Sequence, residues 1–298
     1  MAQGRHRCPP ACSQRGARLS GPARHRRLRT ALAAYLRRVR AVAADPERLV
    51  ICAGFTQALS PLTRALGAPV MALEDPGLAD RDRTIATAGG SHLPIPVDAI
   101  GARTGLLTGT SASAMVVTPA HQFPLGVTLA PSRRSELPSW AAESGGLIIE
   151  DDYDAEFRYD RQPVGALRGL APEHVAYTGT ASKTLAPALR LGWMVLPCAL
   201  LDAVVQTKHD RDLGSPALEQ LTLARLIDSG AYERHLRRAR RHYSHATALQ
   251  PRDGTTASGA TPCWLPCAIT SRRPRSAAPP PDCTWSSPCP AGSTPPRS

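Results

Sequence analysis

The sequence predicts an α/β fold, a three-layer α/β/α sandwich with a mostly parallel sheet. Short apolar segments of strand length alternate with longer segments whose apolar residues recur at helical spacing. Two of the short segments, residues 147–149 and 175–177, are followed at once by polar and charged residues. Because ligands bind at the carboxyl ends of the strands in such sheets, these two points mark a candidate site.

The individual elements follow from the same periodicities. A first helix is predicted for residues 28–39, where leucines and a valine recur every three or four positions between arginines. A second helix follows Gly54, and a third precedes Gly89. Further helices are predicted at 131–145 (with Trp140 on the inner face), 200–208, 216–227 and 231–249. Strands are predicted at 49–52, 70–73, 93–97, 114–117, 147–149, 175–177 and 193–196.

The positive charge of the chain is unevenly distributed. A formal net charge of +12 ordinarily suggests a nucleic-acid or membrane partner. However, no acidic residue precedes Asp45, whereas residues 45–228 are mixed in sign. The excess therefore lies in the two ends and in the helix at 231–249. For the arginines of that helix, a solvated helix face is the favoured interpretation over nucleic-acid binding.

Three regions are expected along the chain. Residues 1–26 are predicted to be a disordered basic tail, residues 27–249 a folded domain, and residues 250–298 a disordered tail rich in Pro, Arg and Ser. The arginine-rich, acid-free N-terminal stretch also mimics an organellar transit peptide, which is the less favoured interpretation.

Eight cysteines are present, but they lack the Cys and His spacing of a zinc site, so no metal is expected. No apolar run reaches transmembrane length, and no membrane partner is expected. A reducing, cytoplasmic compartment is the simplest assignment.

The polar residues after the two strands suit an aldehyde cofactor that carries a phosphate. Lys183 could form a Schiff base with the aldehyde. Asp151 could keep a pyridine nitrogen protonated, so that the ring can act as an electron sink. Tyr153 could donate a hydrogen bond to the phenolic oxygen of that ring. Donors for a phosphate are supplied by Thr180, Ser182 and Arg190.

Each of these residues alone is weak support, because a strand-terminal acid is more often a helix cap and a lysine is usually a solvated charge. Their joint order and spacing favour the cofactor site. The turn at Gly54 presents backbone N–H groups to an anion, although structural turns of this kind are commoner. His121 and Gln122 are predicted at the same sheet edge as Asp151, within reach of the ring; for His121, a structural role in a loop has equal weight.

Five sequence blocks stand out when the chain is compared with known motifs. They are GFTQAL (54–59), EDPG (74–77), TPAHQFPLG (118–126), IEDDYDAEFRYD (149–160) and SKTLAPALRLGWMVLP (182–197). In these blocks the chain resembles the large domain of the fold-type I pyridoxal-phosphate-dependent aminotransferases. More closely, it resembles the aminotransferase-like domain of the MocR subfamily of GntR-type transcription regulators.

The resemblance implies pyridoxal 5'-phosphate as the cofactor, with Lys183 as the Schiff-base lysine, Asp151 as the partner of the pyridine nitrogen and Tyr153 as the donor to the phenolic oxygen. It also implies a phosphate cradle built from Thr180, Ser182, Arg190 and the turn at Phe55 and Thr56. Leu78 stands where relatives commonly carry an aromatic residue that stacks on the cofactor ring. A homodimer is allowed for, because family members usually build their site across two subunits.

Three functions stay open. The first is a remnant of a MocR/GntR-type regulator that binds a small-molecule amino acid or effector but has no winged-helix DNA-binding module, so DNA binding is not expected of this chain alone. The second is an aminotransferase that interconverts an amino acid and an oxo acid. The third is a nonenzymatic basic protein that acts on nucleic acid. Residues 250–298 show no pattern of the family's small domain, so we expect both ends to be out of the ancestral reading frame and turnover to be very low.

Overall fold

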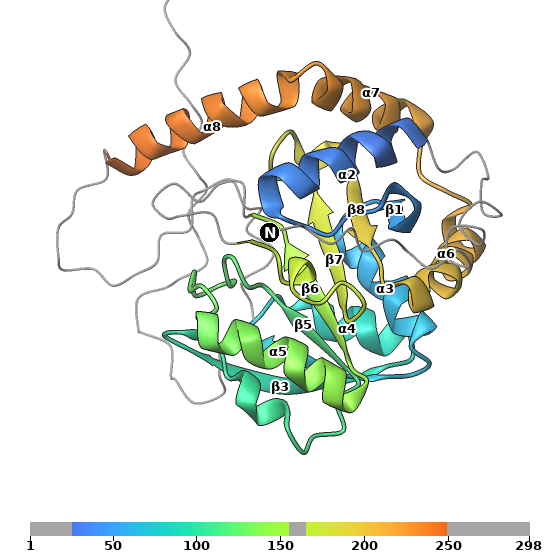
Figure 1. The fold of residues 1–298 in the computed structure, drawn as a ribbon, viewed down its shortest axis with the longest axis vertical. Coiled ribbons are helices and arrows are strands. Elements are labelled where there is room, and N and C mark those ends of the chain that lie inside the picture. Colours follow the sequence, from blue (N-terminus) through green and yellow to red (C-terminus); the bar gives the residue numbers. More distant parts are fainter. Residues whose placement is uncertain (1–25, 155–164, 249–298) are drawn as a thin grey trace, which may run out of the picture. The chain divides into compact units, whose positions relative to one another are not determined.

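A sheet of eight strands forms the centre of the residues that the structure describes, 26–154 and 165–248 (Figure 1). In this computed structural model the strand order is β1-β8-β7-β6-β5-β2-β3-β4. The strands are β1 (Leu49–Cys52), β2 (Val70–Asp75), β3 (Ser91–Asp98), β4 (Gly101–Ala102), β5 (Ala114–Val117), β6 (Leu147–Asp152), β7 (Val175–Thr180) and β8 (Gly192–Val195).

The middle of this sheet is parallel. Strands β3, β2, β5, β6 and β7 pair in parallel, whereas β8 runs antiparallel to β7 and β1, and β4 antiparallel to β3. The predicted mostly parallel sheet is confirmed. Strands β6 and β7 continue beyond the apolar segments 147–149 and 175–177 that predicted them. The polar residues of the candidate site therefore belong partly to the strands themselves.

Helices cover both faces of the sheet, which gives the predicted three layers. On one face, α3 (Phe55–Ala65), α4 (Asp80–Thr87) and α6 (Cys198–Asp212) bury apolar residues against β2, β5 and β6. The other face is covered by α2 (Arg26–Arg40), α5 (Pro131–Ser144), α7 (Ala217–Asp228) and α8 (Ala231–Ala248). Short 3-10 helices are η1 (Pro46–Arg48), η2 (Thr104–Leu107), η4 (Leu167–Gly169) and η5 (Pro187–Leu189).

Helix α2 shows why the sequence pattern predicts this architecture. Leu28, Leu32 and Leu36 are fully buried on one side of the helix, whereas Arg37 and Arg38 are exposed. Each buried leucine contributes roughly 1.5–3 kcal/mol relative to an exposed one. An apolar stripe at helical spacing therefore holds the helix against the sheet.

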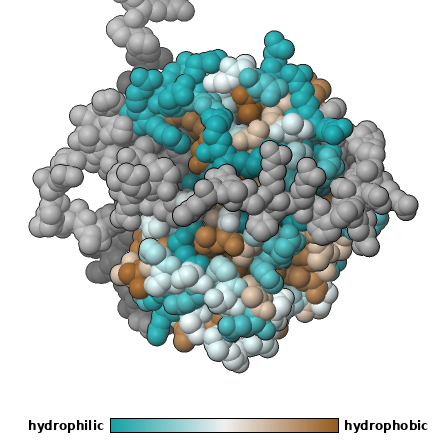
Figure 2. Space-filling model, in the orientation of Figure 1, coloured by the Kyte–Doolittle hydropathy of each residue, from teal (hydrophilic) through white to brown (hydrophobic). Residues whose placement is uncertain are grey.

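The arginine-rich helix α8 follows the same rule. Tyr232 and Leu236 are buried in the core that α2 also lines, whereas Arg234, Arg237 and Arg238 are exposed. Figure 2 shows a largely hydrophilic surface over the part of the molecule where α8 lies in Figure 1. These arginines thus form a solvated helix face, which was the favoured interpretation.

The predicted tails, residues 1–26 and 250–298, lie outside the described residues, apart from Arg26 at the start of α2. Within the described ranges, no helix combines the length and the apolar character needed to cross a membrane.

Candidate functional site

Strand β6 ends in three consecutive acids that point to different faces of the sheet. Side chains alternate along a strand, and Ile149 packs with α3 and α6 whereas Ile148 packs with α5. Asp151 therefore lies on the face of α3, α4 and α6. Glu150 and Asp152 lie on the opposite face.

The two acids on the opposite face are engaged by the fold. The guanidinium of Arg40 donates to both carboxylate oxygens of Asp152, at 2.9 and 3.1 Å, and the hydroxyl of Tyr177 donates to it at 2.6 Å. Glu150 accepts hydrogen bonds from the backbone N–H groups of Leu167 and Arg168. Burial raises the pKa of Glu150 to about 7. Both acids fasten neighbouring segments to the sheet.

Asp151 is buried but much less completely bonded. Its Oδ2 atom lies 3.4 Å from Nη2 of Arg81, and the same guanidinium lies 3.7 Å from Glu74 and 5.4 Å from the ring centroid of Phe55. Burial raises the pKa of Asp151 to about 7, against the opposing effect of the Arg81 charge. Asp151 and Phe55, both predicted site residues, thus share one neighbour. Arg81 and Glu74 were not predicted.

The rings of His121 and Tyr153 stack at 6.2 Å between centroids and 16° between planes. Nδ1 of His121 also lies 2.5 Å from a carboxylate oxygen of Asp154. Burial and the nearby Asp154 raise the pKa of Tyr153, so its phenol keeps the proton that it could donate. The structure therefore brings these two predicted residues together.

Gln122 is committed to the loops around it. Its side-chain amide donates to the carbonyl oxygens of Pro76 at 2.7 Å and Phe123 at 2.6 Å, and its Oε1 accepts from the backbone N–H of Leu125 at 3.1 Å. Because these bonds use both ends of the amide, the contacts seen here give Gln122 a positioning role for the loops that follow β2 and β5.

Lys183 lies half-buried in the turn that directly follows β7. The turn is held locally, since the hydroxyl of Thr180 donates to the carbonyl of Leu191 at 3.3 Å and accepts from the backbone N–H of Ser182 at 3.1 Å. In the parallel register of β6 and β7, Asp151 lies opposite Thr178. Lys183 thus follows the strand beside that of Asp151, at the same carboxyl edge.

A close glycine contact joins this turn to the start of α3. Gly192 on β8 pairs with both Thr180 and Cys52. A Cβ atom at Gly192 would lie 2.8 Å from Cα of Gly54 and 2.9 Å from the carbonyl oxygen of Gly179. Only glycine allows this approach. The N–H groups in the first turn of α3 have no acceptor within the helix. This turn therefore begins next to Gly179, the residue before Thr180, at the end of β7.

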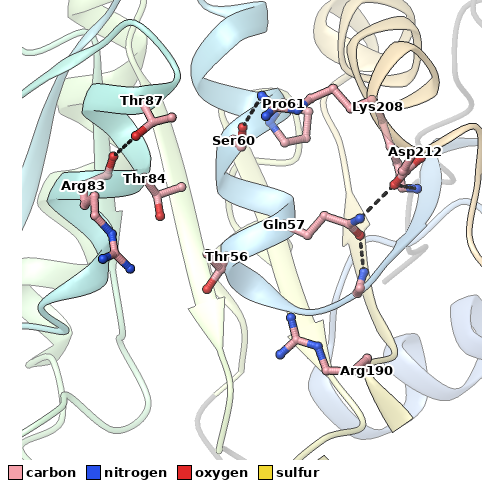
Figure 3. A pocket seen from close by; sticks show the side chains of 12 residues that line it. Thr56, Gln57, Ser60, Pro61, Arg83, Thr84, Thr87, Arg190, Lys208 and Asp212 are labelled. Carbon is pink, nitrogen blue, oxygen red and sulfur yellow. Dashed lines mark hydrogen bonds and ion pairs between the residues drawn. The ribbon is translucent and has the colours of Figure 1, made fainter. Parts of the chain in front are cut away.

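A cavity of about 460 Å³ opens beside this contact (Figure 3). Thr56 at the start of α3 and Arg190 both line it, and the backbone of Arg190 has φ +47°, a strained conformation for a non-glycine residue. The other lining residues come from α3, α4, α6 and the turn before α3: Ala53, Gln57, Ser60, Pro61, Arg83, Thr84, Thr87, Lys208, Arg211 and Asp212.

These observations fit a phosphorylated pyridine. Helix N–H groups, hydroxyls and Arg190 are donors that a phosphate monoester requires; Thr56 and Arg190 line one cavity, and the Gly192 contact holds the start of α3 against the end of β7. A buried carboxyl group on the same face of the sheet suits a cationic ring nitrogen. Across residues 26–154 and 165–248, no cluster of three or more His, Cys, Asp or Glu side chains could hold a metal ion.

Residues 3–250 match the family model of aminotransferase class I and II. The chain belongs to this family. Among relatives, the pyridoxine biosynthesis transcriptional regulator PdxR of Corynebacterium glutamicum is 35% identical over 226 residues, 75% of this chain and 49% of the relative. The probable rhizopine catabolism regulatory protein MocR of Rhizobium meliloti is 35% identical over 223 residues, with 74% and 45% covered. The chain thus spans about half the length of the curated relatives it matches.

Solved aminotransferases share the fold. The crystal structure of Pyrococcus horikoshii kynurenine aminotransferase, in complex with PMP, superposes with a TM-score of 0.70 and 26% identity, covering 78% of this chain and 60% of that one. The predicted resemblance to MocR-type regulators and to fold-type I aminotransferases is confirmed. This member of the aminotransferase class I and II family is an aminotransferase-like domain of the pyridoxal-phosphate type.

Proposed function

We propose that the chain binds pyridoxal 5'-phosphate at the carboxyl edge of β6 and β7 and acts as the ligand-sensing domain of a MocR-type transcription regulator. The observation that carries this proposal is the separation of the acids of β6. Asp151 is directed to the face of α3, where the phosphate donors gather, while Glu150 and Asp152 are bonded elsewhere. The regulators among its relatives favour sensing over catalysis as the role of the site.

In this proposal each predicted residue other than Gln122 has one task. Lys183 is the amine that attaches the cofactor aldehyde, and Asp151, in its ionised form, holds the proton on the ring nitrogen. Tyr153 donates a hydrogen bond from its phenolic hydroxyl to the oxygen on the ring, and His121 orients Tyr153 by stacking. The phosphate is bound by the first turn of α3 with Phe55 and Thr56, and by Thr180, Ser182 and Arg190. The bound cofactor supplies an electron-accepting ring.

We further propose a small amino acid or related effector as the ligand, a homodimer as the assembly and the cytoplasm as the location. The relatives PdxR and MocR are named as regulators, and a transcription regulator of a bacterium acts in the cytoplasm, where the DNA lies. The exposed Leu213 and Leu218 near α7 add apolar surface that a second subunit could cover.

Aminotransfer is the second candidate function. It is favoured by the presence of Lys183, Asp151 and Tyr153 at one sheet edge, because this set suffices to attach the cofactor and tune its ring. An amino acid that shifts the spectrum of the bound cofactor permanently, with release of an oxo acid, would favour this candidate. A reversible shift without product would favour sensing.

The test is an absorbance titration of the 298-residue protein with pyridoxal 5'-phosphate. The chain contains two lysines, Lys183 and Lys208, and Lys208 is bound to Asp212 at 2.6 Å. Lys183→Ala should abolish the visible band of the lysine-bound cofactor, whereas Lys208→Arg, which removes the amine but keeps the charge, should retain it. An unchanged band in Lys183→Ala would reject the proposed function.

A further inference from the structure

Arg81 is a buried cation with incomplete hydrogen bonding. It extends from α4, only 3% of its surface is exposed, and its Nε and Nη1 atoms have no hydrogen-bond partner within the described ranges. Leaving such donors unpaired in the protein interior is unfavourable. An arrangement of this kind therefore indicates a place where the packing serves something other than stability.

The guanidinium of Arg81 lies between two carboxylates. Its Nη2 atom is 3.4 Å from Oδ2 of Asp151 on β6, and its Nη1 atom is 3.7 Å from Oε2 of Glu74 on β2. Glu74 also accepts from the backbone N–H and the hydroxyl of Thr118, at 3.2 and 2.5 Å. The guanidinium of Arg81 could therefore pair with either acid after only a small movement of its side chain.

One of these acids is the residue proposed for the cofactor ring. A protonated ring nitrogen and the guanidinium of Arg81 would both approach the carboxylate of Asp151 on the α3 face. Two cations held at one buried carboxylate repel each other strongly, because the surroundings screen charge weakly. Binding of the ring nitrogen therefore requires that the Arg81 charge move toward another acceptor.

We propose that Arg81 is a positioning residue that competes with the protonated ring nitrogen of pyridoxal 5'-phosphate for Asp151, and that Glu74 accepts the guanidinium when the cofactor binds. This inference rests on the proposed function and extends it: the Glu74–Arg81 pair sets how tightly the chain holds its cofactor. Competition between Arg81 and the ring nitrogen would keep cofactor binding by this sensing domain reversible.

A different role for Arg81 predicts the opposite effect. Its guanidinium lies over the ring of Phe55, with 5.4 Å between Cζ and the ring centroid. A planar guanidinium can also stack on an aromatic ring. Relatives commonly carry a stacking aromatic residue at the position of Leu78. If Arg81 stacked on the cofactor ring in its place, removing Arg81 would weaken cofactor binding rather than strengthen it.

The experiment measures the dissociation constant of pyridoxal 5'-phosphate by absorbance in four full-length variants. Arg81→Met should bind about tenfold more tightly, the change that one competing interaction of about 1.4 kcal/mol produces. Glu74→Gln should bind about tenfold more weakly, because Asp151 is then the one of these two carboxylates left to pair with Arg81, and the guanidinium competes more strongly with the ring nitrogen. The double variant should match Arg81→Met, since Glu74 then has no guanidinium to accept. Arg64→Met, an exposed arginine on α3, is the matched control and should not change affinity.

A cofactor analogue with a C–H group in place of the ring nitrogen isolates the competition from general effects on the fold. This analogue should bind wild type and Arg81→Met equally. Weaker or unchanged binding of pyridoxal 5'-phosphate by Arg81→Met would overturn the inference while leaving the proposed function intact. If Arg81→Met does not fold, Glu74→Gln decides: unchanged or tighter binding overturns the inference. Absence of a bound-cofactor band in every protein, wild type included, rejects the proposed function and this inference with it.

Discussion

The acidic side chains on the two faces of β6 differ in how completely they are hydrogen-bonded. On the α2 side, Asp152 receives three hydrogen bonds from Arg40 and Tyr177, and Glu150 receives two from backbone N–H groups. On the α3 side, Asp151 faces one guanidinium at 3.4 Å. Neighbouring acids in one strand acquire separate roles, because alternation directs their side chains into separate environments. The bonded acids hold the fold, and the poorly bonded acid is the one proposed to contact the cofactor ring.

The largest expected effect concerns the bonded face. Asp152→Asn breaks the buried ion pair with Arg40, and breaking such a pair costs roughly 3–5 kcal/mol of unfolding free energy. Asp151→Asn should not destabilise the fold at pH 7, because it removes the cost of ionising a buried acid and Arg81 keeps Glu74. Denaturant unfolding of both variants checks this. Equal losses would contradict the division between the two faces.

Cofactor affinity should respond to the other face. Asp151→Asn removes a charge-assisted contact to the ring nitrogen worth about 1.5–3 kcal/mol, so the dissociation constant of pyridoxal 5'-phosphate should rise about tenfold to a hundredfold. Tyr177→Phe, on the α2 face, should leave this constant unchanged. An absorbance titration measures both. If Tyr177→Phe weakened binding and Asp151→Asn did not, the ring nitrogen would lie on the α2 face of the sheet, contrary to the proposal.

The pH dependence of stability should sharpen the same contrast. The pKa of Asp151 in the folded chain, about 7, lies above that of an unfolded aspartate, about 3.9. The folded state therefore holds a proton that the unfolded chain releases, and the free energy of unfolding falls as the pH rises from about 4 to about 7.

Asp151→Asn should remove this contribution, so its unfolding free energy should fall less over that range, by roughly 4 kcal/mol, because about three pKa units at about 1.4 kcal/mol each separate the two values. Glu150, whose pKa burial also raises to about 7, titrates in both proteins and cancels in the comparison. Unfolding by urea at several pH values provides the measurement, and parallel profiles would show that Asp151 does not titrate as described.

A smaller effect is expected from Tyr177→Phe on stability. The change removes one hydrogen bond to Asp152, which still has two from Arg40, so the loss should be about 1 kcal/mol. Thermal unfolding checks it. A loss as large as that of Asp152→Asn would mean that the hydroxyl, rather than the guanidinium, holds this acid.

Much of the architecture follows from the sequence, because apolar periodicity reports directly which side of an element is buried. The leucines of α2 and the apolar starts of β6 and β7 are examples. The order of acid, lysine and arginine along the chain also predicts which residues bind the cofactor, and these assignments stay predictions. These features are local, so a single sequence displays them.

The parts that could not be predicted depend on contacts between distant segments. Arg81 lies in the charged sequence DRDR, which is typical of a solvated helix, and its burial requires Phe55, Glu74 and Asp151 to meet around it. Gln122 is predicted to approach the cofactor ring, but its amide is bonded to Pro76 and Leu125. The contact with Pro76 depends on how the loops after β2 and β5 pack against each other, which a sequence pattern does not report. The EDPG block at 74–77 was the one available signal for Glu74.

Reductive trapping tests whether Lys183 carries pyridoxal 5'-phosphate at this sheet edge. The protein is incubated with the cofactor, treated with borohydride and digested, and the modified peptide is identified by mass. With two lysines in the chain, Lys183 and Lys208, the assignment is unambiguous. We expect the modification on Lys183 in wild type and in Lys208→Arg. Modification of Lys208 or of the N-terminal amine alone, or no modification, would contradict it.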